Sequence, residues 1–186
     1  MADLTRRLAR LRVPLGFLFA LLVIVFARPT GFTLVAGGGV AVLGEALRIW
    51  AAGHLNKSRE VTSSGPYRWF AHPLYVGSSV MGVGLAIASG SLLVAGLVLL
   101  YLATTITAAV RSEEAFLRGK FGAEYDRYRR GETGARDAAA RSRRFSTAQA
   151  IANREHRAVG GLVLGVLLLA LKAAYNGAFW RAAGTR

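Results

Sequence analysis

The chain of 186 residues is 53% hydrophobic and only 18% charged, a balance that excludes an ordinary soluble domain of this size. The absence of cysteine excludes disulfides, thiol nucleophiles and cysteine-ligated metal sites, and the three histidines form no HExxH pattern, so no metal site is expected. The formal net charge of +14 suits either nucleic acid or an anionic membrane surface as a partner, and the position of the charges decides between them.

Five apolar segments follow one another along the chain, with lengths close to the roughly 17 to 25 residues that a helix needs to cross a bilayer. We expect transmembrane helices over residues 13–27, 31–53, 73–88, 91–110 and 159–173. Ser89 and Gly90 predict a tight hairpin between the third and fourth helices. Gly161 and Gly165 in the last helix have GxxxG spacing, which favours close helix packing. The sequence therefore predicts an all-α fold, a polytopic transmembrane helical bundle of about five spans that forms a single membrane domain over residues 1–186.

The distribution of basic residues predicts the orientation in the membrane. The first apolar segment is similar to a signal peptide, but no small-residue cleavage site follows Ala27, so we expect it to remain as an anchor. Lys and Arg number four before the first span, three between Gly53 and Phe70 and twelve over residues 111–157, against four on the opposite side. The positive-inside rule then places the N-terminus and the basic segment 111–157 in the cytoplasm, at the plasma (inner) membrane. Residues 137–144 fit either a short basic helix on the membrane surface or a solvated linker.

This orientation, together with attraction to anionic headgroups, accounts for most of the net charge. We therefore expect a membrane, and not nucleic acid, as the partner of the basic residues. The sequence does not indicate an oligomeric state.

The first polar segment with candidate chemistry lies at the start of the third predicted helix. Gly65 and Pro66 predict a turn, and the fixed φ of Pro73 suits the first turn of a helix, which places His72 at the helix entrance. Tyr75 follows about one turn later. The unpaired N–H groups and the positive dipole end at such an entrance suit a carboxylate. An ordinary interfacial belt of aromatic residues is the alternative interpretation.

The second polar segment is the carboxylate pair Glu113 and Glu114, directly after the fourth predicted span. Two like charges repel, and the C-terminal end of a helix dipole is itself negative, so we expect a cationic or hydrogen-bonding partner. A salt-bridged interfacial helix that uses Arg111 and Arg118 is the alternative. Because the hairpin brings the start of the third helix and the end of the fourth to the same membrane face, we expect the pair to converge with His72.

Four short segments carry a resemblance to a known family. GPYR (65–68), HPLYVG (72–77), EE (113–114) and FGAEYDRY (121–128), in this order and spacing, are similar to the isoprenylcysteine carboxyl methyltransferase and phospholipid methyltransferase family of integral membrane enzymes. The resemblance covers about residues 47–130. It implies a cytoplasm-facing pocket for S-adenosylmethionine, roofed by the polar segment that follows the glutamate pair.

The resemblance and the chemistry of this cofactor together assign its binding residues. Ribose hydroxyls suit a carboxylate, adenine suits a flat apolar wall, and the sulfonium suits an aromatic face. The residues expected to bind the cofactor are Tyr67, His72, Tyr75, Gly77, Glu113 and Glu114. A sulfonium donor needs alignment and exclusion of water, not a metal or a covalent intermediate.

The chain departs from the family pattern at two places. Ala71 stands where the family commonly has arginine, and Arg68 is the candidate substitute. After Tyr128 the chain lacks the family's Arg-Val-Pro and continues to a further apolar helix, so family residues there cannot be transferred.

The acceptor of the methyl group is less defined. Glu45 and Arg48 lie three residues apart on one face of a predicted span, where intramembrane charges indicate either function or a self-neutralising structural pair. An amine acceptor needs a carboxylate to take its proton, whereas a carboxylate acceptor needs Arg48 or Arg68 to hold it. For the carboxylate acceptor we therefore expect these two arginines to be the catalytic residues. The resemblance implies methyl transfer to a lipid or lipidated small molecule, most of all an isoprenylcysteine-like carboxylate, with a phospholipid amine as the runner-up. A non-enzymatic lipid-binding or assembly protein is the rival.

Overall fold

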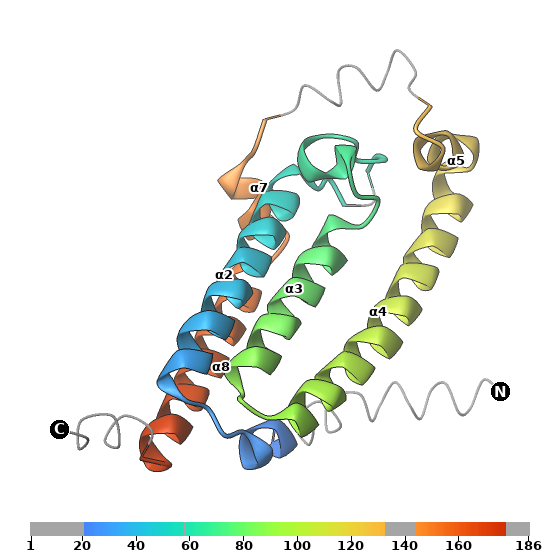
Figure 1. Ribbon diagram of the computed structural model, residues 1–186. Helices are drawn as coiled ribbons and strands as arrows, with labels where there is room; N and C mark the ends of the chain where they lie inside the picture. The colour runs from blue at the N-terminus through green and yellow to red at the C-terminus, as the bar shows by residue number, and fades with distance from the viewer. Residues whose placement is uncertain (1–20, 58, 133–143, 178–186) are drawn as a thin grey trace.

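The computed structural model describes residues 21–57, 59–132 and 144–177, and all of its regular structure in these ranges is helical. Residues 21–26 are helical, and the further elements are α2 (Gly31–His54), η1 (Gly65–Arg68), α3 (Pro73–Ala88), α4 (Leu92–Phe121), α5 (Ala123–Arg129), α7 (Thr147–Ala152) and α8 (His156–Tyr175) (Figure 1). The predicted all-α fold is confirmed. Most of the first predicted span, and the proposed surface helix over 137–144, lie outside the described residues.

Within the part of the chain that the structure describes, three helices, α2, α4 and α8, are long and apolar enough to cross a membrane, and α3 is a shorter apolar helix of 16 residues. Large apolar side chains on them face outward, among them Phe32 at 82% and Leu92 at 94% exposure, as a surface in contact with lipid requires. The fold is therefore a helical bundle of the polytopic membrane type. Its description as one domain over the whole chain stays a prediction.

Helices α2 and α3 lie side by side with their backbones in contact (Figure 1). A Cβ added to Gly37 would lie 2.2 Å from the Ala88 amide nitrogen, and one added to Gly84 would lie 2.3 Å from that of Ala41. Only glycine permits this approach, as in small-residue contacts between transmembrane helices. The glycines of both helices therefore set how close the two backbones lie.

The hairpin between α3 and α4 forms where Ser89 and Gly90 predict it. Gly90 has φ 62°, a left-handed conformation that favours glycine, and the Ser91 side chain accepts a hydrogen bond from the Val94 amide as the N-cap of α4. Buried Ala86 and Val94 pack together at this base. From there α4 leans away from α3 toward the other end of the molecule (Figure 1).

Helix α4 does not end with its apolar segment at residue 110 but continues to Phe121. Its polar extension contains no proline, and the helix stops only at Gly122, where φ is 51°. The glutamate pair therefore lies inside a helix and not after one. α5 begins at Ala123 and lies across the end of α4 (Figure 1).

The C-terminal helices pack against α2. The Asn153 side-chain amide donates to the carbonyl oxygens of Ala52 (2.8 Å) and Leu55 (2.9 Å), and the Gln149 amide donates to Leu55 O at 2.8 Å. These carbonyls belong to the C-terminal end of α2, where no further helix turn can satisfy them. The short helix α7 thus caps α2 from the side, and α8 then runs back along the bundle (Figure 1).

The expected close packing of the GxxxG motif is wrong. A Cβ on Gly161 would meet no described atom within 4 Å, and one on Gly165 would meet only Leu85 Cδ2, at 3.9 Å. Helix α8 instead turns Leu162 and Leu169 inward, and both are buried. The motif lies largely off the packed face of the helix.

Candidate functional site

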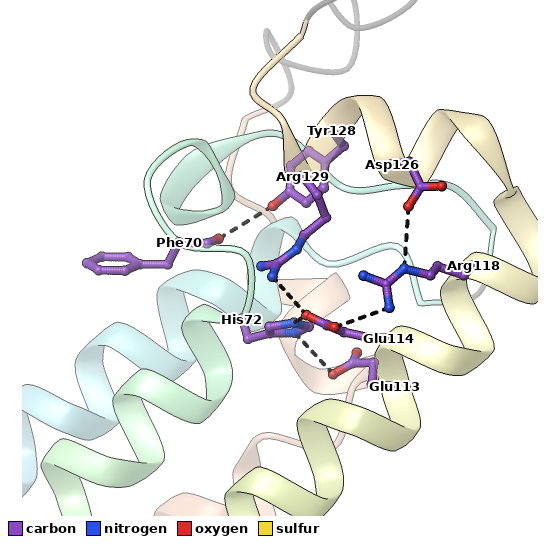
Figure 2. A network of polar contacts seen from close by, with 8 residues as sticks. All are labelled: Phe70, His72, Glu113, Glu114, Arg118, Asp126, Tyr128 and Arg129. Carbon is purple, nitrogen blue, oxygen red and sulfur yellow. Dashed lines mark hydrogen bonds and ion pairs between the residues drawn. The ribbon is translucent and has the colours of Figure 1, made fainter.

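His72 lies between the two glutamates, as the hairpin argument predicts. Its Nδ1 is 3.5 Å from Glu113 Oε2, and its Nε2 is 3.3 Å from Glu114 Oε1 (Figure 2). Pro73 opens α3, so His72 is held at the N-cap with its side chain directed toward α4. The start of α3 and the polar end of α4 are therefore joined through one imidazole.

Two arginines compensate the second carboxylate. Glu114 Oε2 is 3.5 Å from Arg118 Nη1, one turn along α4, and Glu114 Oε1 is 3.1 Å from Arg129 Nη2 on α5 (Figure 2). Arg118 Nε also faces Asp126 at 3.4 Å. Arg118 is one of the arginines expected from sequence, whereas Arg129 is not, because its contact depends on α5 folding back over α4.

Helix α5 forms a roof over this site. The left-handed Gly122 reverses the chain, Tyr125 is buried at 1% exposure, and the Tyr128 hydroxyl donates to Tyr67 O at 2.9 Å. The same hydroxyl lies 3.4 Å from Phe70 O (Figure 2). Burial raises the pKa of Tyr128 to about 12, so the hydroxyl stays protonated and remains a donor. Tyr128 of the FGAEYDRY segment therefore fastens the roof to the loop before α3.

The hydrogen bond that His72 donates to Glu113 raises the pKa of His72 above its usual value, against the opposing effect of partial burial, and Glu114 adds to the rise. A protonated imidazole between two carboxylates also relieves their mutual repulsion. The site thus favours a charged His72.

A polar cavity of about 520 Å³ opens beside this network, between the loop before α3, helix α4 and the roof. Its volume is within the ~300–1,000 Å³ that is usual for small-molecule sites. Carboxylate, ammonium, hydroxyl and aromatic groups all contribute to the wall. Its polar and aromatic lining residues are Lys57, Glu60, Thr62, Tyr67, Tyr75, Ser112, Glu113, Phe116, Tyr125 and Tyr128.

A smaller cavity of about 300 Å³ adjoins the polar cavity on the outer side of the roof. Arg68, Ala71 and Arg129 line it, and Ala71 also lines the polar cavity. A longer side chain at position 71 would therefore lie at the boundary between these two cavities. Arg68, which is exposed, is therefore close to the place of the missing side chain.

A third, apolar cavity of about 550 Å³ lies deeper among the helices, lined by residues of α3, α4 and α8. Its lining residues carry no formal charge, and hydroxyl groups of Ser78, Tyr101 and Thr105 are among its few polar atoms. Tyr75 and Ala109 line both this apolar cavity and the polar cavity. Tyr75 therefore stands where a polar and a lipid-like compartment meet.

Of the predicted site residues, Tyr67, Tyr75 and Glu113 line the polar cavity, His72 and Glu114 lie in the network beside it, and Arg48 and Gly77 lie elsewhere. Arg48 is held by Glu45 at 3.3 Å and by Glu155 at 2.7 Å, and it donates to the Ser78 hydroxyl. Gly77 faces α2, because a Cβ there would be 2.6 Å from Arg48 Cγ. The pairing of Arg48 with Glu45 was expected from their spacing. The contact with Glu155 could not be predicted, because Glu155 is far away in the chain and its neighbouring residues carry no signal for it.

No group of three or more His, Asp or Glu side chains is placed to hold a metal ion in the part of the chain that the structure describes. The fold and the site define a helical membrane protein with a charged, roofed pocket at one end and an apolar cavity beneath it. A family model for phospholipid methyltransferases matches residues 27–124, which is more than half of the chain. The chain belongs to this family, in agreement with the resemblance of its motifs.

One curated relative is the nickel-cobalt-cadmium resistance protein NccN of Alcaligenes xylosoxydans xylosoxydans. It is 38% identical over 85 residues, which are 45% of this chain and 39% of that protein. The chain thus matches well under two thirds of the relative's length. No solved structure matches the chain.

Proposed function

We propose that the protein transfers a methyl group from S-adenosylmethionine to an acceptor embedded in the membrane. The observation that carries this proposal is the junction at Tyr75, where the polar cavity with Glu113 meets the apolar cavity. A reaction between a polar cofactor and a lipid-like acceptor needs such a junction, because the two molecules require opposite surroundings. The family to which the chain belongs supports the same reaction class.

The residues of the polar cavity fit the cofactor. Glu113 offers a carboxylate to ribose hydroxyls, and the rings of Tyr67, Tyr75 and Tyr128 offer faces to adenine and to a sulfonium. When bound, the cofactor supplies a methyl group that is already activated by its positive sulfur. Gly77 faces α2 and would act on the pocket only by letting α3 lie close to that helix.

The protein's own task is then alignment and exclusion of water. The contacts of His72 with Glu113 and Glu114 fix the distance between α3 and α4 on the two sides of the cavity. Arg129 and Tyr128 hold the roof down from α5. Alignment of two reactants in a closed site accounts for a large part of the rate enhancement that such a displacement needs.

A phospholipid amine is the acceptor that the geometry supports best. An amine must lose a proton, and two carboxylates, Glu60 and Glu113, line the polar cavity, so one can accept the proton while the other binds the cofactor. This choice also agrees with the family description.

A carboxylate of an isoprenylcysteine-like molecule is the second candidate. The hydrogen bond from Arg48 to Ser78, which lines the apolar cavity, is the observation in its favour. Arg48 is already paired with Glu45 and Glu155, however, and Arg68 lies at the outer cavity. To bind an anionic acceptor, the side chain of one of these arginines would have to leave its present contacts and turn toward the apolar cavity.

Calorimetric titration of the purified protein with S-adenosylmethionine tests the cofactor assignment. We expect micromolar binding that is lost in His72→Ala, Glu113→Gln and Glu114→Ala. Glu124→Gln removes an exposed acid from α5 and serves as the matched control with unchanged affinity. A folded parent protein that binds no cofactor would favour the rival reading as a lipid-binding or assembly protein.

Methyl-labelled cofactor distinguishes the two acceptors. Membranes are incubated with the protein, separated into lipid and protein fractions and treated with base. Base-stable label in the lipid fraction indicates an amine, and volatile, base-labile label indicates a carboxyl ester. Label in neither fraction, from a protein that binds the cofactor, would contradict both acceptors.

A further inference from the structure

A cluster of three charged side chains lies within the bundle, on the α2 side of α3. Glu45 and Arg48 come from α2, and Glu155 comes from the turn between α7 and α8. The preceding residue, Arg154, has φ 63°, and this left-handed turn directs the next side chain inward. Glu45 and Glu155 are 4% and 6% exposed, so the cluster is shielded from water.

The cluster has one more carboxylate than it has cations. Arg48 is the single basic member, and it faces both acids at 3.3 Å and 2.7 Å. The same nitrogen of Arg48, Nε, faces both acids, so Glu45, which is farther from it, is only partly compensated. Buried carboxylates that are only partly compensated repel a further negative charge, and the low dielectric of such surroundings strengthens the effect.

This negative cluster stands directly behind the wall of the apolar cavity. Arg48 donates to the Ser78 hydroxyl, and Ser78 lines that cavity together with Tyr75. The lining of the cavity contains no formal charge of its own. The cluster is therefore a source of charge directly behind the cavity wall, on the α2 side of α3.

We propose that Glu155, together with Glu45, makes the apolar cavity reject anionic amphiphiles. The two acids outweigh the arginine that would otherwise attract a carboxylate or phosphate toward Ser78. Discrimination by like charge is an effective way to exclude a wrong partner whose apolar part fits equally well. A long-chain fatty acid is a molecule of that kind.

Glu155 lies outside residues 27–124, the part of the chain that the family model matches. The C-terminal helices therefore add a carboxylate to a charged pair, Glu45 and Arg48, that lies within the matched part. The inference rests on the proposed function only in taking the apolar cavity as the place of the acceptor chain.

Displacement of a pyrene-labelled long-chain alcohol from the purified protein in neutral detergent tests the proposal. Oleate and oleyl alcohol compete in parallel, so their ratio of inhibition constants reports the effect of charge at constant chain length. We expect oleate to compete much more weakly than oleyl alcohol with the parent protein. Glu155→Gln should reduce this ratio about threefold, and the double variant Glu45→Gln/Glu155→Gln should reduce it about tenfold or more, equivalent to about 1.4 kcal/mol.

Arg157→Gln is the matched control, because it changes an exposed charge two residues from Glu155 and should leave the ratio unchanged. An unchanged ratio in both glutamate variants, or an equal change in the control, overturns the proposal, as does a parent protein that does not bind the pyrene probe. If the double variant does not fold, the single Glu155→Gln variant decides. The assay contains no cofactor, so loss of cofactor binding in a separate titration would contradict the proposed function and not this inference.

Discussion

His72 connects the two helices of the hairpin at the ends away from the turn, where α3 begins and α4 ends. Its two ring nitrogens face one carboxylate each, at 3.5 Å and 3.3 Å. A neutral imidazole can donate only one proton, whereas the protonated ring donates from both nitrogens. The link is therefore complete only when His72 carries its charge.

The raised pKa of His72 predicts a pH-dependent stability. The contribution is fully present below the unfolded value of about 6.5 and is lost as the pH rises through the higher folded pKa. We expect the melting temperature of the parent protein in detergent to exceed that of His72→Gln at pH 6 and to approach it as the pH is raised to 9. A difference that stays constant over this range would show that His72 stabilises by packing alone.

A pair of substitutions can test whether Arg68 takes the place of an arginine at position 71. It lines the outer cavity with Ala71, the position where the family commonly has arginine. If Arg68 supplies the missing cation, Arg68→Gln should weaken cofactor binding about tenfold, the scale of one charge-assisted hydrogen bond, and Arg68→Gln/Ala71→Arg should restore it. Calorimetry measures both. The exposed Arg59→Gln is the control, and equal loss in it would indicate a general charge effect.

At the scale of helices, the contact between α2 and α3 depends on glycine at particular registers. Gly37, Gly44 and Gly84 face backbone atoms, whereas Gly38 and Gly39 face open space. Hydropathy and spacing predict that these segments are helical and lie in the membrane, but they do not predict which glycine is at the contact. The GxxxG motif that begins at Gly161 could not be placed from the sequence for the same reason, because the face of a helix that packs depends on the neighbouring helices.

Substitution by alanine should affect the stability of the fold differently at two of these glycines. A Cβ at position 84 would lie 2.3 Å from the Ala41 amide nitrogen, so Gly84→Ala must push the helices apart, at a cost of about 1–3 kcal/mol. Gly39→Ala meets no described atom within 4 Å and should be neutral or slightly stabilising, since alanine favours the helix. Unfolding of both variants in denaturing detergent measures the difference. Equal behaviour would show that the α2–α3 distance adjusts freely.

At the scale of the whole molecule, the order of apolar segments was enough to predict the hairpin and the meeting of His72 with Glu113 and Glu114. That prediction needs only topology, because a hairpin returns the chain to the membrane face where it started. The contact of Glu155 with Arg48 is different, since it requires the position of α8 around the bundle, which hydropathy does not contain. The roof contact of Arg129 depends similarly on the reversal at Gly122.

The orientation of the whole bundle gives the last prediction. The basic residues predict that the roof with α5 faces the cytoplasm, and α8 runs from the end near Arg48 to Tyr175 at the opposite end. Because the chain has no cysteine, single cysteines can be introduced without background labelling. In intact cells a membrane-impermeant maleimide should label Tyr175→Cys and not Glu132→Cys, both positions being exposed, and opened cells should allow labelling of both. The reverse pattern would place the pocket outside, where the cytoplasmic supply of S-adenosylmethionine cannot reach it, and would contradict the proposed reaction.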